Sequence, residues 1–155
     1  MTFDAGELGG REAGLTDADR VAALLRAVCD EAGAGPVMVA GQSYGGLAAL
    51  EAGLRSDVPV DEIVAQSPSL WWGGARRGVG EGTLMGDLRV GSVRPRQGVR
   101  LRLQVGTLEE TMHPVVDDCA ELLRHLGVAV ELDQYRSGHD VAWWREGLVR
   151  ALDEW

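Results

Sequence analysis

The sequence predicts an α/β fold in which a parallel sheet is flanked by helices. Two observations lead to this prediction: segments of strand character alternate with segments of helical periodicity, and turn residues follow each predicted strand. Right-handed crossovers between parallel strands bring the residues after each strand to one edge of the sheet. A length of 155 residues fits one domain, residues 1–155, with a hydrophobic core.

One stretch has the pattern of a nucleophile elbow. The apolar run from Pro36 leads into Gly41-Gln-Ser-Tyr-Gly45, and a helical pattern starts at Leu47. A strand, a sharp turn and a helix in this order expose a serine hydroxyl, here that of Ser43. We expect the glycines two residues before and after the serine to be required by the turn. The helix start directs backbone N–H groups at developing negative charge, so the amide of Tyr44 is the predicted oxyanion donor.

The N-terminal elements are predicted from caps and apolar spacing. Residues 1–15 are rich in glycine and lack periodicity, so we expect a loop. Thr16 with Asp19 resembles a capping box, and apolar residues at helical spacing follow until Gly33. After the strand at 36–41 and a helix to Leu54, residues 61–66 predict a second, short strand.

The C-terminal half continues the alternation. Residues 73–98 contain many glycines and predict a long irregular connection, which in a compact domain suggests a lid or substrate-binding segment. Residues 99–105 alternate apolar and polar side chains, as a half-buried strand does. Pro114 and Gly127 are typical of the first turn and the end of a helix. The last predicted elements are a strand at 128–135 and a helix at 143–155.

Three residues that follow predicted strands suggest nucleophilic catalysis. A serine needs a histidine to take its proton, and an acid must hold that histidine in the right tautomer. The order Ser43, Glu109, His139 is the serine–acid–histidine order of α/β-hydrolases. Glu110 and Asp140 remain alternatives for the acid because they adjoin Glu109 and His139.

Other features restrict the classes of partner and cofactor. The net charge of −9 argues against nucleic acid or an anionic membrane as a partner, and we expect neither a signal peptide nor a membrane span. His113 and His125 fall in helical patterns and are expected at the surface. Since no cluster has metal-ligand spacing, neither a metal nor another cofactor is expected. Cys29 and Cys119 are predicted to be buried free thiols of a cytoplasmic protein.

Four motifs in order carry a family resemblance. They are Gly41-Gln-Ser-Tyr-Gly-Gly-Leu47, Ser67-Pro-Ser-Leu-Trp-Trp72, Gly106-Thr-Leu-Glu109 and Gly138-His-Asp-Val-Ala-Trp-Trp-Arg-Glu-Gly-Leu148. Together they resemble the enterochelin (enterobactin) esterase family, in the esterase D group of α/β-hydrolases, over roughly residues 36–155. The resemblance implies that Ser43 is the nucleophile, His139 the base and Glu109 the acid. It also implies hydrolysis of the ester bonds of a catecholate siderophore, the trilactone enterobactin or its iron complex, with release of iron in the cell.

The resemblance covers only part of that family's pattern. Its members have a longer hydrolase domain, so we expect only the second half of an α/β-hydrolase-type sheet, about four strands from the nucleophile strand onward. The first strand should then have an unpaired edge. The second oxyanion donor, which comes from a loop after an earlier strand, should be lacking. Self-association, or pairing with a separate N-terminal half, is the interaction that this predicts.

Aromatic and basic residues after the second strand suggest how such a substrate would bind. Catecholate rings are flat and, when bound to iron, anionic. Trp71 and Trp72 could stack on them, and Arg76 and Arg77 could pair with their charge. The alternative is that the tryptophans belong to the core and the arginines to a solvated loop.

Three further interpretations of the function stay open. One is another carboxylesterase of the esterase D group, either S-formylglutathione hydrolase-like or feruloyl-type. The second is a non-catalytic remnant that binds the siderophore without cleaving it. The third is one half of a two-chain enzyme.

Overall fold

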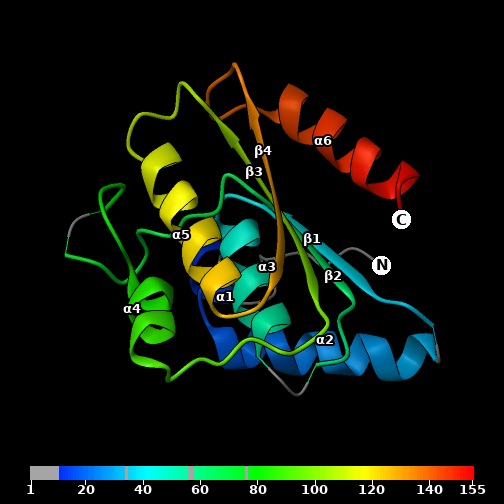
Figure 1. Cartoon of the computed structure of the whole chain (residues 1–155). Helices are drawn as coiled ribbons and strands as arrows, with labels where there is room; N and C mark the ends of the chain where they lie inside the picture. Colours follow the sequence, from blue (N-terminus) through cyan, green and yellow to red (C-terminus); the bar gives the residue numbers. More distant parts are fainter. Residues whose placement is uncertain (1–10, 34, 56–57, 76) are drawn as a thin grey trace.

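The computed structural model describes residues 11–33, 35–55, 58–75 and 77–155. Its centre is a sheet of four parallel strands in the order β1-β2-β3-β4 (Figure 1). The strands are β1 (Met38–Gln42), β2 (Glu62–Gln66), β3 (Arg100–Gly106) and β4 (Ala129–Tyr135). The predicted parallel α/β sheet is thereby confirmed, and its strands are those expected from the sequence to within two residues at each end.

Helices cover the two faces of this sheet unequally. They are α1 (Arg11–Leu15), α2 (Ala18–Ala32), α3 (Tyr44–Leu54), α4 (Thr83–Val90), α5 (His113–His125) and α6 (Val141–Asp153). Each strand is added on the same side of the previous one, so right-handed crossovers place α3, α4 and α5 on one face. Figure 1 shows α6 by itself on the other face of the sheet.

The hydrophobic core lies between the sheet and the α3 side. Ile63 of β2 and Leu101 and Leu103 of β3 point to this face and are at most 1% exposed. Helix α3 is buried from Gly46 to Leu54. A Cβ at Gly53 would lie 2.6 Å from the Ile63 side chain, so this glycine lets α3 lie close against β2.

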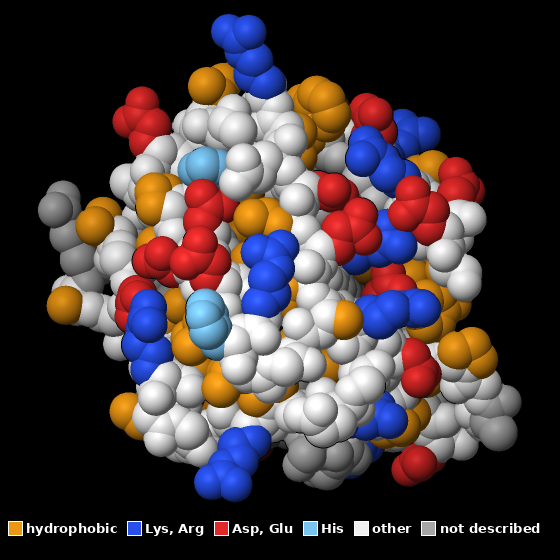
Figure 2. Space-filling view, viewed as in Figure 1, with side chains coloured by type: hydrophobic (Ala, Val, Ile, Leu, Met, Phe, Trp, Pro, Cys, Tyr) orange, Lys and Arg blue, Asp and Glu red, His pale blue; other side chains and the backbone are white. Residues whose placement is uncertain are grey.

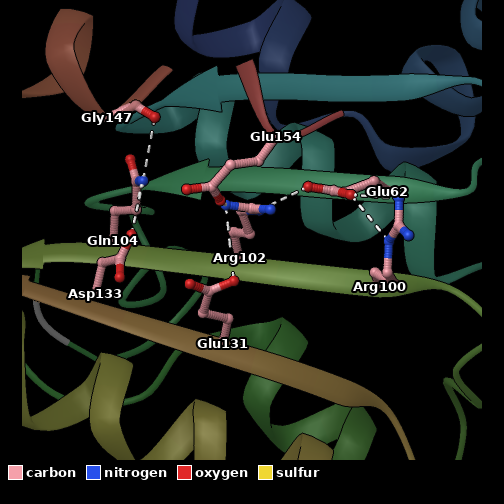
Figure 3. A network of polar contacts seen from close by, with 8 residues as sticks. All are labelled: Glu62, Arg100, Arg102, Gln104, Glu131, Asp133, Gly147 and Glu154. Atoms are coloured by element: carbon pink, nitrogen blue, oxygen red, sulfur yellow. Dashed lines mark hydrogen bonds and ion pairs between the residues drawn. The ribbon is translucent and has the colours of Figure 1, made fainter. Parts of the chain in front are cut away.

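The opposite face of the sheet is polar and holds α6 through hydrogen bonds (Figure 3). Side chains from all four strands form one hydrogen-bonded row: Gln42 donates to Gln66 at 3.1 Å, Gln66 to Gln104 at 2.6 Å, and Gln104 to Asp133 at 3.1 Å. Gln66 Nε2 also donates to the Trp144 carbonyl at 2.7 Å and Gln104 Nε2 to the Gly147 carbonyl at 3.4 Å. Arg102 pairs with Glu154 just after α6. These contacts fix the position of α6 across β2 and β3.

Some expected loops contain helices. Residues 11–15 of the predicted N-terminal loop form α1, whereas residues 1–10 lie outside the described part. The expected irregular connection at 73–98 contains α4, whose Leu84, Met85 and Leu88 are buried in the core. The prediction of irregular structure is wrong for 83–90, because it relied on the glycine content and overlooked a short apolar helix face.

The start of the first long helix also differs from the prediction. The N-cap of α2 is Asp17, whose carboxylate accepts a hydrogen bond from the Arg20 amide at 3.1 Å. Thr16 instead donates its hydroxyl to the Glu12 carbonyl of α1. A short aspartate side chain beside the first turn is at least as good a cap as threonine.

The surface fits the composition of the chain. Arginine and acidic side chains are interspersed over the face drawn in Figure 2. Among the described helices, none is long and apolar enough to span a bilayer. Cys29 and Cys119 are buried free thiols, as predicted.

A buried carboxyl group in α3 makes stability depend on pH. Glu51 is 6% exposed, and burial raises its pKa from 4.5 to about 7; Arg55 opposes this rise, whereas Asp87 and Asp19 add to it. A carboxyl group whose folded pKa is raised stabilises the fold fully below its unfolded pKa, and this contribution is lost as pH rises through the folded pKa. Stability from Glu51 should therefore fall between about pH 4.5 and pH 7.

Replacing Glu51 by glutamine should remove that loss. We expect Glu51→Gln to change stability little at pH 4.5 and to increase it by about 3 kcal/mol at pH 8, from about 1.4 kcal/mol per pKa unit. Urea unfolding of both proteins across this pH range measures the difference. The matched control is Glu121→Gln, at an exposed position of α5, which should show no such pH dependence. Equal unfolding curves for wild type and Glu51→Gln at pH 8 would contradict the prediction.

Candidate active site

Ser43 lies in a strained turn between β1 and α3. Its φ of 56° and ψ of −118° are unusual for a residue with a side chain. The turn is held by a hydrogen bond from the Ser43 amide to the Gln66 carbonyl at 2.9 Å and one from the Leu47 amide to the Ser43 carbonyl at 3.1 Å. The serine, which is half-buried, stands at the N-terminus of α3.

The two glycines expected to be essential to this turn differ. A Cβ at Gly41 would collide with the Gly45 carbonyl, as predicted. A Cβ at Gly45 would meet nothing within 4 Å, so the expectation is wrong for that position. The tight contact is instead at Gly46, where a Cβ would lie 3.1 Å from the Gln66 carbonyl oxygen and from Pro68 Cα.

Glu109 and His139 form a hydrogen-bonded pair at the same edge of the sheet. Glu109 Oε2 lies 2.7 Å from His139 Nδ1; the carboxylate is buried, whereas the imidazole side chain is 41% exposed. Their two loops are joined, since the Leu108 amide donates to the Ser137 carbonyl at 3.0 Å. A Cβ at Gly106 would collide with this carbonyl, so a glycine is needed where β3 ends.

The surroundings of Glu109 favour its ionised form. Burial by itself would raise the pKa of the carboxyl group, but hydrogen bonds from His139, from the Ser67 hydroxyl and from the Gly106 amide outweigh burial and lower the pKa. Glu109 Oε1 accepts from Ser67 Oγ at 2.6 Å and from the Gly106 amide at 2.9 Å. The second oxygen is thereby directed at the histidine.

Glu110 and Asp140, the alternative candidates for the acid, make no hydrogen bond to His139 among the described contacts. Glu110 is exposed. Asp140 is the N-cap of α6, where its Oδ1 accepts from the amides of Ala142 at 3.0 Å and Trp143 at 3.3 Å, and its Oδ2 accepts from the Ser137 hydroxyl.

The other two histidines lie on α5, and neither side chain is hydrogen-bonded to the Glu109 carboxylate; the His113 amide donates to the Glu109 carbonyl at 2.8 Å. His125 is exposed, as predicted, and its Nδ1 lies 2.8 Å from the Glu121 carbonyl oxygen. His113 is half-buried, which corrects the expectation of a surface residue, and its Nδ1 lies 3.7 Å from an Asp117 carboxylate oxygen.

Two residues of this site have no role in the sequence prediction. Ser67, the first residue after β2, donates to Glu109, and Trp144 of α6 donates its Nε1–H to Ser67 Oγ at 3.1 Å. The Trp144 ring also stands edge-to-face to His139, with centroids 4.6 Å apart. Both residues belong to motifs that carry the family resemblance, and this membership is the feature of the sequence that could have identified them.

An aromatic cluster flanks the turn that carries Ser43. The Tyr44 ring lies 5.6 Å from Trp71 and 5.5 Å from Trp72, both edge-to-face. Arg77 Nη2 donates to the Tyr44 hydroxyl at 3.1 Å, and its guanidinium lies 5.7 Å from the Trp71 ring centroid. Arg76 lies outside the described residues. The structure therefore brings Trp71, Trp72 and Arg77 together beside Ser43, with the two tryptophans half-buried.

Comparison with known proteins identifies the family of this chain. The family model named Esterase, described as "Putative esterase", matches residues 17–155. The chain belongs to this esterase family. Every residue of the site described above lies within the matched range.

Two curated esterases are identical to this chain at about a third of the aligned positions. The iron(III) enterobactin esterase of Escherichia coli O6:H1 is 37% identical over 119 residues, which cover 76% of this chain and 29% of that protein. The iron(III) salmochelin esterase of the same organism is 32% identical over 155 residues, covering 94% and 37%. The chain thus spans about a third of the length of these esterases.

Solved structures agree with the fold. The enterobactin esterase from Shigella flexneri, determined in the presence of 2,3-di-hydroxy-N-benzoyl-serine, superposes with a TM-score of 0.68 at 35% identity, covering 76% of this chain and 30% of that one. Esterase PE8 superposes with a TM-score of 0.65 at 22% identity over 93% of this chain and 61% of its own, which supports the fold alone. The chain therefore folds as part of an α/β-hydrolase-type domain.

Proposed function

We propose that this esterase-family chain carries the nucleophile, acid and base of a serine esterase. The observation that supports this most is the arrangement at the sheet edge. Ser43 in a strained strand-to-helix turn and the 2.7 Å pair of Glu109 and His139 each follow the carboxyl end of a parallel strand. Parallel sheets of this kind bind their ligands at that edge.

The chemistry would proceed through an acyl-enzyme. Ser43 Oγ attacks the ester carbonyl carbon while His139 Nε2 takes the hydroxyl proton. The C–O bond then breaks, and the imidazolium returns the proton to the departing alcohol. The same nitrogen then takes a proton from water, whose oxygen attacks the acyl carbon; the acyl–Oγ bond breaks, the proton passes to Ser43 Oγ, and the acid leaves. In this proposal Glu109 holds Nδ1–H, which makes Nε2 the basic nitrogen and stabilises the imidazolium.

Tyr44 supplies one oxyanion donor in this proposal. Its amide is at the N-terminus of α3, where N–H groups have no partner within the helix. The partial positive charge of the helix start adds to its attraction for the tetrahedral intermediate.

A catecholate siderophore, free or iron-loaded, is the proposed small-molecule substrate. Two curated relatives are named for enterobactin and salmochelin. Beside Ser43, the cluster of Tyr44, Trp71, Trp72 and Arg77 offers ring faces and a cation to flat anionic catecholates. Arg76 is proposed as a second cation. The two free thiols fit a reducing compartment, so we place this activity in the cytoplasm.

Removing the cation should weaken binding of the catecholate. We expect Arg77→Ala to weaken binding of a ferric catecholate about 3- to 10-fold, because an exposed cation–π contact is worth about 0.5–1 kcal/mol and the charge pairing adds to it. The Arg76→Ala/Arg77→Ala double variant should weaken it further. Quenching of tryptophan fluorescence measures the affinity. The control, Arg124→Ala near the end of α5, should bind as wild type does; unchanged affinity in the double variant would refute the proposed subsite.

A panel of esters tests the proposed reaction. The chain should hydrolyse catecholate serine esters faster than p-nitrophenyl, feruloyl or S-formylglutathione substrates. Preference for feruloyl esters or S-formylglutathione would favour the corresponding other member of the esterase D group. Binding of the siderophore without turnover of any ester would favour a non-catalytic binding protein and would contradict an esterase.

The free edge of β1 is the proposed site of pairing with another polypeptide segment. Among the described strands β1 pairs with β2 alone, and Ala40 in its middle is exposed. Such an edge is a template for association. We propose that it pairs with a second copy of this chain or with the N-terminal half of a two-chain enzyme, which would also bring the second oxyanion donor.

Concentration series test this pairing. Size-exclusion chromatography should show association that increases with concentration. Addition of the expected N-terminal half, as a separate chain or within one longer chain, should reduce association and raise kcat about 10²- to 10³-fold, the usual effect of one oxyanion donor. A monomer at every concentration, fully active by itself, would contradict the proposal.

A further inference from the structure

Ser67 connects the proposed acid to two other elements of the fold. Its side chain is buried, at 0% exposure, and donates to Glu109 Oε1 at 2.6 Å. A hydrogen bond from a hydroxyl to a buried carboxylate is charge-assisted and strong. Together with the Gly106 amide at 2.9 Å, it occupies Oε1 and leaves Oε2 for His139.

Trp144 sets the direction of the Ser67 hydroxyl. An indole N–H can only donate, so at 3.1 Å from Ser67 Oγ it makes this oxygen an acceptor on that side. The serine proton must then point elsewhere, and the short contact is the one to Glu109. The Tyr135 hydroxyl, at 3.4 Å, is the longer alternative.

The backbone holds Ser67 in an uncommon conformation at this point. Its φ of 43° lies in the left-handed region, which costs about 1 kcal/mol or more for a residue with a Cβ. The amide of Ser67 still donates to the Gln104 carbonyl at 2.7 Å, and the amide of Ser69 donates to the Ser43 carbonyl at 3.1 Å. The segment is thereby tied to β3 on one side and to the nucleophile turn on the other.

We propose that Ser67 and Trp144 are positioning residues for the catalytic acid. Trp144 orients the Ser67 hydroxyl, Ser67 fixes Glu109 Oε1, and the remaining oxygen keeps His139 in the tautomer with its proton on Nδ1. The inference depends on the proposed esterase function for its consequence in catalysis, but the hydrogen-bonded chain itself can be tested without turnover. It also gives a physical reason for a serine directly after β2 and a tryptophan on α6.

Loss of either group should reduce turnover without weakening substrate binding. We expect Ser67→Gly and Ser67→Ala to lower kcat about 10- to 100-fold with KM unchanged, the range for a lost hydrogen bond to a charged group. Trp144→Phe keeps a ring beside His139 and removes only the N–H, so it should cost about 3- to 10-fold. Because glycine adopts positive φ without strain, Ser67→Gly should also fold at least as stably as Ser67→Ala.

The decisive experiment reads the His139 tautomer by NMR of the ring nitrogens and carbons in the full chain. The neutral imidazole of the wild type should carry its proton on Nδ1. Ser67→Gly should shift the population toward the Nε2–H tautomer, in the same direction as Glu109→Gln. Ser92→Ala, which removes an exposed serine hydroxyl bonded to Asp87, is the control and should leave the tautomer unchanged.

A double-mutant cycle separates positioning from a general structural effect. In the Glu109→Gln background, Ser67→Gly should cost less than about 2-fold in kcat, because its effect acts through the missing carboxylate. The inference would be overturned if Ser67→Gly lowered kcat by the same factor with and without Glu109→Gln, or if Ser67→Gly kept the wild-type tautomer of His139. If the chain hydrolyses no ester, the proposed function fails, and the tautomer measurement still decides whether Ser67 positions Glu109.

Discussion

Ser43→Ala should abolish ester hydrolysis by this chain. Without Oγ no acyl-enzyme can form, and loss of a serine nucleophile lowers kcat by about 10⁶-fold where it has been measured in hydrolases. We therefore expect turnover through Ser43 to be lost, with at most the weak residual catalysis that substrate binding and the remaining oxyanion donor provide. The measurement is hydrolysis of a chromogenic ester, together with a fluorophosphonate probe whose attachment site is mapped by mass spectrometry. The probe should label Ser43 in the wild type and nothing in the variant.

The fold should survive this change, which makes the loss interpretable. Alanine keeps a Cβ at the φ of 56°, so Ser43→Ala retains the strain of the wild-type turn. Ser43→Gly relaxes this strain and should be more stable than Ser43→Ala by about 1 kcal/mol, although equally inactive. Label on a serine other than Ser43, or turnover by both variants, would exclude Ser43 as the nucleophile. Ser92→Ala, in the turn after α4, should keep full activity.

The sheet and the location of the site could be predicted because both follow from local pattern and chirality. Apolar runs at 36–41 and 61–66 and the alternation at 99–105 are visible in the sequence, and parallel strands can be connected in few ways. Ser43 follows the pattern at 36–41, Glu109 the one at 99–105, and His139 the strand predicted at 128–135. Their meeting at one edge is therefore a consequence of topology, with no knowledge of side-chain contacts.

What the sequence did not predict depends on tertiary contacts. Helix α4 has only eight residues and is flanked by glycines, so burial of Leu84 and Leu88 against the core, rather than propensity, decides its formation. The need for a small residue at Gly46 instead of Gly45 arises from the approach of Pro68, which is distant in sequence. The contact between Ser67 and Trp144 joins positions 77 residues apart. The helix and strand periodicities of a sequence contain no information about such contacts between distant residues.

Glu109→Gln should have the second-largest effect, a loss in kcat of about 10⁴-fold, as for the equivalent change in a well-studied protease triad. An amide in place of the carboxylate can present its NH₂ group to His139, which favours the wrong tautomer and leaves the imidazolium without a counter-charge. The Ser67 hydroxyl and the Gly106 amide, which now donate to Oε1, would still find the amide oxygen. The variant should therefore fold normally and bind substrate with an unchanged KM.

The neighbouring carboxylates provide the matched controls. Glu110→Gln changes an exposed side chain and should cost less than about 2-fold in kcat, as surface changes usually do. Asp140→Asn keeps a good N-cap residue at the start of α6 and should cost little activity and little stability. If Asp140→Asn is instead the crippling change, Asp140 is the acid and the assignment of Glu109 is wrong. A nearly silent Glu109→Gln would leave a Ser43–His139 dyad, in which the buried 2.7 Å contact serves the fold and not the reaction.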